Sequence, residues 1–201
     1  LRTSSHRISP LCPYFGQCGG CDYQHIAYQE QLVLKQKQVE QILKRIGRLN
    51  NIRVLPIVGS PEHFGFRNRI TVHADEGRIG FFKKQSRAVL DIEYCAIASS
   101  EVNESLRELR LHGLPDGAHR TLRAKEGSRT FTQTNDRVAE LLLAYVGEFL
   151  AGKVLLDLYC GSGFMGHALA ERFQTVIGID WSEPAILAAR IAARSNEIYI
   201  R

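Results

Sequence analysis

Four cysteines are placed where together they could bind a metal. Cys12, Cys18 and Cys21 lie within ten residues of one another, and Cys95 ends an apolar stretch far downstream. Thiolates that are buried together repel one another and lose hydration, so such a group is usually bound to a cation or joined in disulfides. Glycines in the run 12–21 allow tight bends and present N–H groups to sulfur, which favours a cluster with bridging sulfides.

The spacing of the cysteines distinguishes the possible metals. Structural zinc sites more often use two short Cys-x-x-Cys pairs, whereas three clustered cysteines and a distant fourth are more common for a 4Fe-4S cluster. The pattern therefore favours iron–sulfur. Zinc, disulfide bonds and cysteines without a ligand role remain the alternatives.

A second motif with chemical potential, Gly161-x-Gly163-x-x-Gly166, follows the apolar run 154–159. It formally satisfies the fingerprint of dinucleotide-binding folds, in which glycines let the backbone approach a pyrophosphate. Asp180 ends the next apolar run, where a carboxylate can accept hydrogen bonds from ribose hydroxyls. The motif therefore predicts a nucleotide-like ligand.

Asp157 separates two classes of ligand for this loop. It lies four residues before the first glycine, where a dinucleotide fold normally has an apolar residue. An acid there suits the cationic methionine end of S-adenosylmethionine (SAM), which has no pyrophosphate. We therefore favour SAM over NAD or FAD, and a glycine turn without a ligand is the remaining alternative.

The residues around the cysteines predict an α+β region. Apolar residues recur at helical spacing over about residues 26–47, and the basic residues Lys35 and Lys37 on its surface are more often solvated than bound to RNA. Three strand-like runs separated by turns follow, and they span residues 66–73, 78–82 and 88–92. This antiparallel meander leads into Cys95, so we expect it to return the fourth thiol to the other three.

Two further features complete this first region. Arg67 and Arg69 alternate with apolar neighbours and share one polar face, which either contacts phosphate or is simply solvated. A short helix is expected over residues 102–111 and a loop over residues 114–119.

The second region alternates helices and strands. A strand ending at residues 131–135 precedes a helix that begins at the N-cap Asn135 and runs to residue 150. The run 154–159 is apolar except for Asp157 and is expected to be buried on both faces. Helices and strands then alternate at residues 167–172, 175–179 and 183–194, and a further strand starts at residue 197. This order predicts the first half of a doubly wound, Rossmann-like α/β fold.

Charge divides the chain at about the same place. Residues 1–125 contain 19 Lys and Arg against 12 Asp and Glu, whereas residues 126–201 contain 7 against 9. A positive field attracts phosphates at long range, so a nucleic acid is a natural partner of the first region, although many basic chains bind none. We therefore predict two domains, 1–125 and 126–201.

The chain lacks features of membrane or secreted proteins. It has no apolar run near the ~20 residues that span a bilayer, and its start does not resemble a secretory signal. We expect a soluble, cytoplasmic protein that acts as a monomer without an obligate protein partner. The chain lacks an initiator Met and stops within a strand-like run, so we expect a fragment at both ends.

Taken together, these motifs resemble one family, the SAM-dependent RNA 5-methyluridine methyltransferases that modify uridines of 23S rRNA or tRNA. The resemblance covers most of the chain and rests on four motifs in one order. These are Cys12-x5-Cys18-Gly-Gly-Cys21 with Cys95, Phe66-Arg67-Asn68-Arg69, Phe131-x-Gln133-x-Asn135, and the run from Leu156 through Gly163.

The resemblance implies a role for individual residues. It makes the four cysteines ligands of a 4Fe-4S cluster, and Gln133, Tyr159 and Asp180 contacts of SAM, beside Asp157, Gly161 and Gly163. A polar strand residue is the alternative for Gln133, and a core aromatic is the alternative for Tyr159.

The implied reaction needs a nucleophilic thiolate that adds to carbon 6 of uracil, so that carbon 5 can accept the methyl group before a base removes its proton. Cys160 lies in the turn expected to bind SAM and is interpreted as a packed thiol. In the family the nucleophile lies later, in a Ser-Cys-Asn-Pro stretch, and the base later still. Neither is expected before Arg201, so no catalytic residue is assigned within this chain.

The chain also departs from the family. The span between Cys95 and Phe131 is shorter than usual, and Phe164 replaces a small or polar residue. In this chain we also expect no N-terminal β-barrel of the kind common in the family. We predict an RNA uridine carbon 5 methyltransferase whose fragment alone is inactive. The alternative is a non-catalytic iron–sulfur module that binds RNA and carries a degenerate nucleotide fold.

Overall fold

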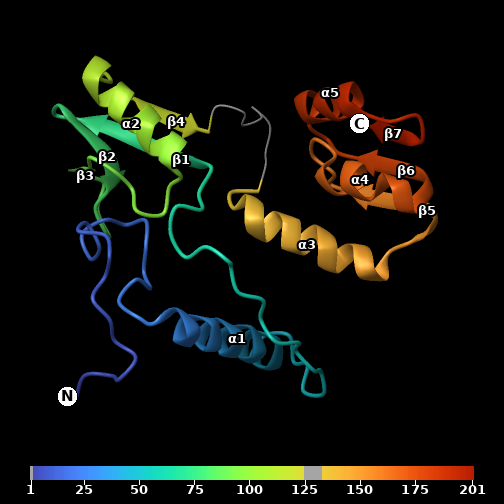
Figure 1. The fold of residues 1–201 in the computed structure, drawn as a ribbon, viewed down its shortest axis with the longest axis horizontal. Coiled ribbons are helices and arrows are strands. Elements are labelled where there is room, and N and C mark those ends of the chain that lie inside the picture. Colours follow the sequence, from blue (N-terminus) through green and yellow to red (C-terminus); the bar gives the residue numbers. More distant parts are fainter. Residues whose placement is uncertain (1, 125–132) are drawn as a thin grey trace. The chain divides into compact units, whose positions relative to one another are not determined.

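The computed structural model describes residues 2–124 and 133–201 and divides the chain into two compact units, Leu1–Ala124 and Lys125–Arg201 (Figure 1). Each unit has its own sheet. The sheet of the first unit is antiparallel and that of the second is parallel, as the sequence predicts. The two units are described separately.

The first unit is built on a four-stranded sheet with one long and one shorter helix. Its elements are α1 (Tyr28–Arg45), β1 (Arg69–Asp75), β2 (Arg78–Phe82), β3 (Val89–Asp91), α2 (Ser100–His112) and β4 (His119–Arg123). The strands are ordered β3-β2-β1-β4, so β1 and β2 are central. The expected meander is therefore present.

The core of this unit lies between α2 and one face of the sheet. Alternate residues of β1 are buried, and they pack in one cluster with the buried side of α2. Val72 and Leu106 are fully buried, which is the largest contribution that an apolar side chain can make to folding. The side chain of Ser99 caps α2 by accepting a hydrogen bond from the N–H of Val102.

Strand β4 was not expected. The sequence predicts a loop over residues 114–119, but His119 opens a strand, and every residue of that strand pairs with β1. The sequence of β4, His-Arg-Thr-Leu-Arg, contains one apolar residue, so its pattern alone does not indicate a strand. Although its own sequence does not predict a strand, its pairing with β1 supplies the backbone hydrogen bonds that form one.

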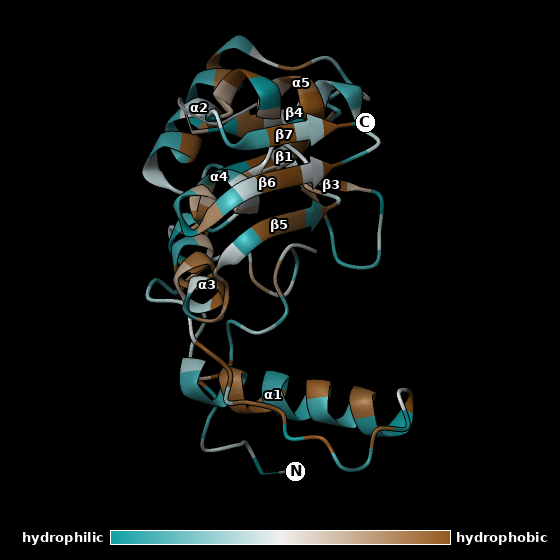
Figure 2. Cartoon of the chain, turned by 90° about the vertical axis from the view of Figure 1, so that its right-hand side faces the viewer, coloured by the Kyte–Doolittle hydropathy of each residue, from teal (hydrophilic) through white to brown (hydrophobic). Residues whose placement is uncertain are grey.

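Helix α1 lies apart from this core, and none of its residues is buried. Figure 2 shows that hydrophobic and hydrophilic segments alternate along it. An extended segment, residues 55–60, is held against the helix by hydrogen bonds to side chains of α1. Gln36 bonds to the backbone of Leu55 and Ile57, and the N–H of Ser60 donates to the Tyr28 hydroxyl at 2.6 Å.

The second unit is the start of a doubly wound α/β fold. Its elements are α3 (Asp136–Phe149), β5 (Gly152–Leu158), α4 (Phe164–Leu169), a 3-10 turn at Ala170–Arg172, β6 (Phe173–Ile179), α5 (Glu183–Ala192) and β7 (Glu197–Ile200). The three strands are parallel in the order β5-β6-β7. The predicted alternation of helix and strand is confirmed.

The sequence predicts a strand ending and a helix cap ahead of α3. Asn135 caps α3 as expected, since its side chain accepts a hydrogen bond from the N–H of Val138 at 3.0 Å. Phe131, in the strand ending expected before it, lies outside the described residues.

The prediction that β5 is buried on both faces is wrong. Val154, Leu156 and Leu158 are 55–58% exposed, whereas Leu155 and Asp157 between them are partly buried. The exposed side chains alternate with the partly buried ones, so they share one face of β5, and that face is left largely uncovered. A continuous apolar run here therefore does not imply burial on both sides. In the part of the chain that the structure describes, no helix is long and apolar enough to cross a membrane.

Candidate functional site

The turn between β5 and α4 has an unusual backbone. Tyr159, Gly161 and Gly163 all have positive φ, at 60°, 55° and 84°. Glycine adopts this conformation without strain, but a tyrosine rarely does. The neighbouring structure must therefore hold the Tyr159 backbone in it. The Tyr159 side chain is 85% exposed, which makes the interpretation as a core aromatic wrong.

Asp180 ties this turn to the end of β6. One carboxylate oxygen accepts the Gly161 N–H at 2.8 Å, and the other accepts the Ser182 N–H at 2.8 Å. The carboxylate therefore links the start of α5 to the glycine turn. Each oxygen of a carboxylate can accept more than one hydrogen bond, so this role leaves capacity for a ligand hydroxyl.

Asp157 is the least satisfied acid at the site. Its Oδ2 atom is buried and has no hydrogen-bond partner among the described residues. Burial raises the pKa of Asp157, the Gly166 N–H opposes this, and the negative charge of Asp180 raises it further. Two carboxylates thus end neighbouring parallel strands, the edge at which open α/β sheets bind their ligands.

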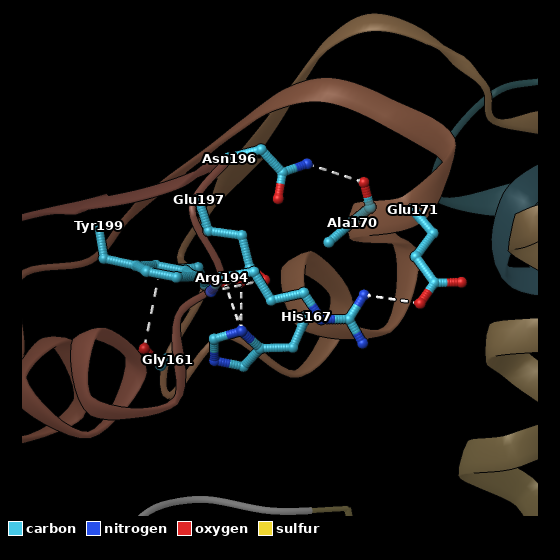
Figure 3. Close-up of polar contacts among 9 residues, drawn as sticks. Gly161, His167, Ala170, Glu171, Arg194, Asn196, Glu197 and Tyr199 are labelled. Atoms are coloured by element: carbon cyan, nitrogen blue, oxygen red, sulfur yellow. Dashed lines mark hydrogen bonds and ion pairs between the residues drawn. The ribbon is translucent and has the colours of Figure 1, made fainter.

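A buried polar network lies under the glycine turn (Figure 3). The carboxylate of Glu197 accepts the Tyr199 hydroxyl at 2.7 Å and the Arg194 N–H at 3.2 Å, and it contacts Nδ1 of His167. Burial alone would raise the pKa of Glu197, but these hydrogen bonds outweigh it and the pKa lies below its usual value. Burial and the Glu197 charge raise the pKa of Tyr199 far above its usual range.

This network explains why the loop needs its glycines. A Cβ atom at Gly166 would lie 2.6 Å from the Tyr199 hydroxyl, and one at Gly178 would lie 2.3 Å from the Tyr199 ring. At Gly163 it would lie 2.5 Å from Nε2 of His167. These positions are too close for any side chain, so the glycine spacing serves packing as well as backbone conformation.

Sequence reasoning missed Glu197, Tyr199 and His167. The available signal was a glutamate at the first position of an otherwise apolar strand, where a buried acid requires partners. The partners themselves come from α4 and from two residues further along β7, so only the fold brings them together.

Cys160 lies in the same turn but is poorly suited to attack a substrate. Its side chain is 7% exposed, and burial, followed by the charges of Asp157 and Asp180, raises its pKa to about 11. A cysteine attacks as the thiolate, and this thiol stays protonated at neutral pH. The geometry therefore supports the interpretation of Cys160 as a packed thiol.

The first unit holds the cysteine-rich run against its sheet. The Gly19 N–H donates to the Phe82 carbonyl at 3.0 Å, and the Lys84 N–H donates to the Gln17 carbonyl at 2.7 Å. Downstream, the Asn103 side chain accepts the N–H of Cys95 at 2.8 Å and donates to its carbonyl. The end of β2 and the start of α2 thus fix the two cysteine segments.

The four thiols of this unit influence one another electrostatically. Burial raises the pKa of Cys18 and Cys95, and charge on Cys12 and Cys21 raises both further, against opposing backbone hydrogen bonds. All four are free cysteines. Among residues 2–124 and 133–201, no three His, Cys, Asp or Glu side chains are close enough to be recognised as the ligands of a metal ion.

Gln133, the remaining predicted cofactor residue, lies partly buried two residues ahead of the N-cap of α3. The structure therefore brings Asp157, Tyr159, Gly161, Gly163 and Asp180 together around one turn. Gln133 belongs to the segment that enters α3.

Comparisons with known proteins agree with one another. Residues 116–200 match the family model described as tRNA (Uracil-5-)-methyltransferase. A tRNA (uracil(54)-C(5))-methyltransferase of Schizosaccharomyces pombe is 30% identical over 93% of this chain and 46% of its own length. A 23S rRNA (uracil(1939)-C(5))-methyltransferase of Aliivibrio fischeri is 23% identical over 97% of this chain and 61% of its own length.

A solved structure shares the fold. The tRNA (uracil-54, C5)-methyltransferase of Pyrococcus abyssi, in complex with S-adenosyl-L-homocysteine, aligns with a TM-score of 0.75 at 23% identity. The alignment covers 100% of this chain and 67% of that chain. The chain spans about half the length of the curated relatives described above.

The packing beneath the turn gives a first prediction. Gly166→Ala should destabilise the second unit by about 1–3 kcal/mol, because the new methyl group meets the Tyr199 hydroxyl. Adding Tyr199→Phe removes that hydroxyl, so the double variant should lose less than the sum of the two single losses. Urea unfolding of the four proteins measures this coupling.

Gly152→Ala is the matched control for this cycle, because a Cβ there meets its nearest atom at an ordinary 3.9 Å. Strict additivity of Gly166→Ala and Tyr199→Phe would show that the turn does not depend on this contact.

Proposed function

Because the chain belongs to the RNA uracil-C5 methyltransferase family, we propose that the protein transfers a methyl group from SAM to carbon 5 of a uridine, in 23S rRNA or tRNA. The observation that best supports SAM as the cofactor is the buried Oδ2 atom of Asp157, which has no partner among the described residues. A buried carboxylate without a partner is costly, and a bound cation would offset that cost.

SAM fits this arrangement better than a dinucleotide does. Its methionine end carries positive charge, which complements Asp157, whereas the pyrophosphate of NAD would add negative charge beside Asp157 and Asp180. Asp180 is placed to accept ribose hydroxyls while it holds the turn through Gly161 and Ser182. SAM supplies the methyl group, and the residues of this turn bind and orient it.

Tyr159, Gly161, Gly163 and Gln133 complete the proposed cofactor site. The positive φ of Tyr159 leaves its ring exposed beside the glycine turn, where it can cover a bound ligand. Gly161 and Gly163 keep the backbone open to a close approach. Gln133 is included because it matches the family motif.

The attacking thiolate is assigned elsewhere in the full-length protein. Cys160 is buried, and its pKa of about 11 leaves it as a neutral thiol at physiological pH. Its place next to Asp157 and Asp180 would also set two negative charges against a developing thiolate. In the proposed reaction Cys160 therefore packs under the cofactor turn.

We further propose that Cys12, Cys18, Cys21 and Cys95 hold a 4Fe-4S cluster. The charges of Cys12 and Cys21 act on both Cys18 and Cys95, which supports a common site, and backbone hydrogen bonds hold both cysteine segments against the sheet. The Gly20 N–H already points to the Cys18 sulfur at 3.4 Å, as donors to cluster sulfurs do. Three clustered cysteines and a distant fourth favour this cluster over a structural zinc ion, which more often uses two short Cys-x-x-Cys pairs.

Methyl transfer is tested directly with the full-length protein. Incubation with SAM carrying a labelled methyl group and with RNA that lacks 5-methyluridine should place the label on carbon 5 of a uridine. Digestion of the RNA and chromatography of its nucleosides identify the product. Label on another nucleoside, or no transfer in the presence of a bound cofactor, would contradict the proposed reaction.

Replacing Asp157 by Asn tests the cofactor site and separates binding from folding. Removing the charge should weaken SAM binding by about ten-fold or more, as expected for a charged contact. Calorimetry with SAM, and with NAD as a control ligand, measures this effect.

The same variant should be more stable than the wild type in the absence of SAM at neutral pH. The pKa of Asp157 is raised, so its charged form disfavours folding, and this cost grows as the pH rises through the raised pKa. A destabilised Asp157→Asn protein with unchanged SAM affinity would show that the carboxylate is structural.

The cluster predicts a coloured protein. Anaerobically purified protein should be brown, with broad absorption near ~400 nm from charge transfer between thiolate and iron. Cys95→Ser should release iron and lower the stability of the first unit, because the energy of a metal site contributes to folding. Cys160→Ser is the matched control and should keep the colour. A colourless protein with stoichiometric zinc would refute the iron–sulfur assignment.

A further inference from the structure

The face of the first unit's sheet that points away from α2 carries an ordered set of polar side chains. The intervening residues Ile70, Val72 and Leu122 are buried with α2, so their neighbours along β1 and β4 point to the opposite face. In the register of the two strands each outward residue lies opposite one of its own kind: Arg69 opposite Arg123, Thr71 opposite Thr121, and His73 opposite His119. We call these six residues with Phe82 the outer face.

One end of the outer face is a row of rings. His73 stacks on Phe82 with their centroids 4.1 Å apart and their planes at 25°, and the His119 ring lies 5.9 Å from His73. The row crosses three adjacent strands, β2, β1 and β4. Phe82 is 39% exposed although its side chain is apolar. Flat, partly exposed rings in a row form a surface on which nucleobases can stack.

The other end of the outer face is a row of guanidinium groups. Arg69 and Arg123 are directly opposite each other, an arrangement of like charges that destabilises a sheet. Burial lowers the pKa of Arg69, and the positive charges of Arg123 and Arg67 lower it further. An anion bound between the two groups would benefit from both charges.

A hydroxyl row lies between the rings and the arginines. The hydroxyl oxygens of Thr71 and Thr121 are 2.9 Å apart and exposed. Successive rows are two residues apart along each strand, so the ring row and the arginine row are separated by roughly 13–14 Å. Two successive nucleotides of an extended single strand span a comparable length. The rows thus offer, in order, surfaces for a base, a sugar hydroxyl and a phosphate.

We propose that the outer face binds single-stranded RNA, with a base on the ring row and a backbone phosphate between Arg69 and Arg123. This proposal rests on the proposed function, which requires an RNA substrate, and it assigns the surface. A single strand is favoured because its bases are free to stack on protein rings, whereas those of a duplex are stacked on one another. Acid on this side of β1 occurs at Asp75, at the turn, where Arg78 lies opposite it.

The charge part of the proposal has a matched control within one strand. Arg123→Gln removes a charge from the outer face, whereas Arg120→Gln removes the same charge from the other side of β4, where Arg120 lies opposite Val72. Fluorescence anisotropy of the full-length protein with a labelled single-stranded RNA measures affinity against salt. Arg123→Gln should reduce the slope of log K against log salt by about 0.7, and Arg120→Gln should leave it unchanged.

The ring part is tested at Phe82. Phe82→Leu keeps apolar bulk without a ring and should weaken RNA binding about ten-fold with an unchanged salt slope, whereas Phe82→Tyr should retain affinity. Circular dichroism confirms that each variant is folded. A double-stranded competitor of the same sequence should displace the probe poorly.

The outcomes distinguish this surface from the proposed function. If wild-type protein binds single-stranded RNA but Arg123→Gln and Arg120→Gln behave alike and Phe82→Leu binds normally, the outer face is overturned while the methyltransferase proposal stands. Better competition by the duplex also overturns it. Wild-type protein that binds no RNA at all would instead refute the proposed function.

Discussion

Tyr199 can be buried in the second unit only because the backbone around it carries no side chains at Gly166 and Gly178. Its hydroxyl donates to the buried carboxylate of Glu197, which also contacts His167 of α4. Strand β7 is thereby joined to α4 by packing and hydrogen bonds at once. The shape of the turn after β5 depends on this contact, because any side chain at the glycines would displace the ring or the loop.

The turn after β5 also brings the carboxylates of Asp157 and Asp180 to the proposed ligand site. Asp180 is satisfied by backbone N–H groups and acts as a structural link, whereas Asp157 keeps one buried oxygen without a partner among the described residues. The two acids therefore differ in what a ligand would gain from them: a hydrogen-bond acceptor at Asp180 and a negative charge at Asp157. Burial raises the pKa of Cys160, and the charges of the two acids raise it further, so the charges that favour a cationic ligand also disfavour a nucleophile at this position.

In the first unit one strand connects two proposed roles. The backbone carbonyl of Phe82 accepts the N–H of Gly19 in the cysteine-rich run, while its ring stacks on His73 of the outer face. Phe82 therefore links the cysteine-rich run directly to the ring row. If both proposals hold, a cluster bound by the cysteines would stiffen the end of β2 that carries a ring of the proposed RNA surface.

The sequence by itself determined the local elements and the class of the fold. Helix α2, strands β2 and β6, the N-cap Asn135 and the alternation around the glycine loop follow from periodicity, capping and turn residues, which act over a few positions. The positions of Asp157 and Asp180 at the ends of β5 and β6 also follow from the order of the strands. The remaining features depend on contacts between residues far apart in the sequence, so they are seen only in the folded structure. Strand β4 exists through its pairing with β1. The apolar run of β5 is exposed because one face of that strand is left largely uncovered, and Glu197, Tyr199 and His167 meet because β7 folds against α4. The like-with-like register of the outer face has the same origin, since a shift of β4 by one residue in the pairing would turn Arg123, Thr121 and His119 to the other face.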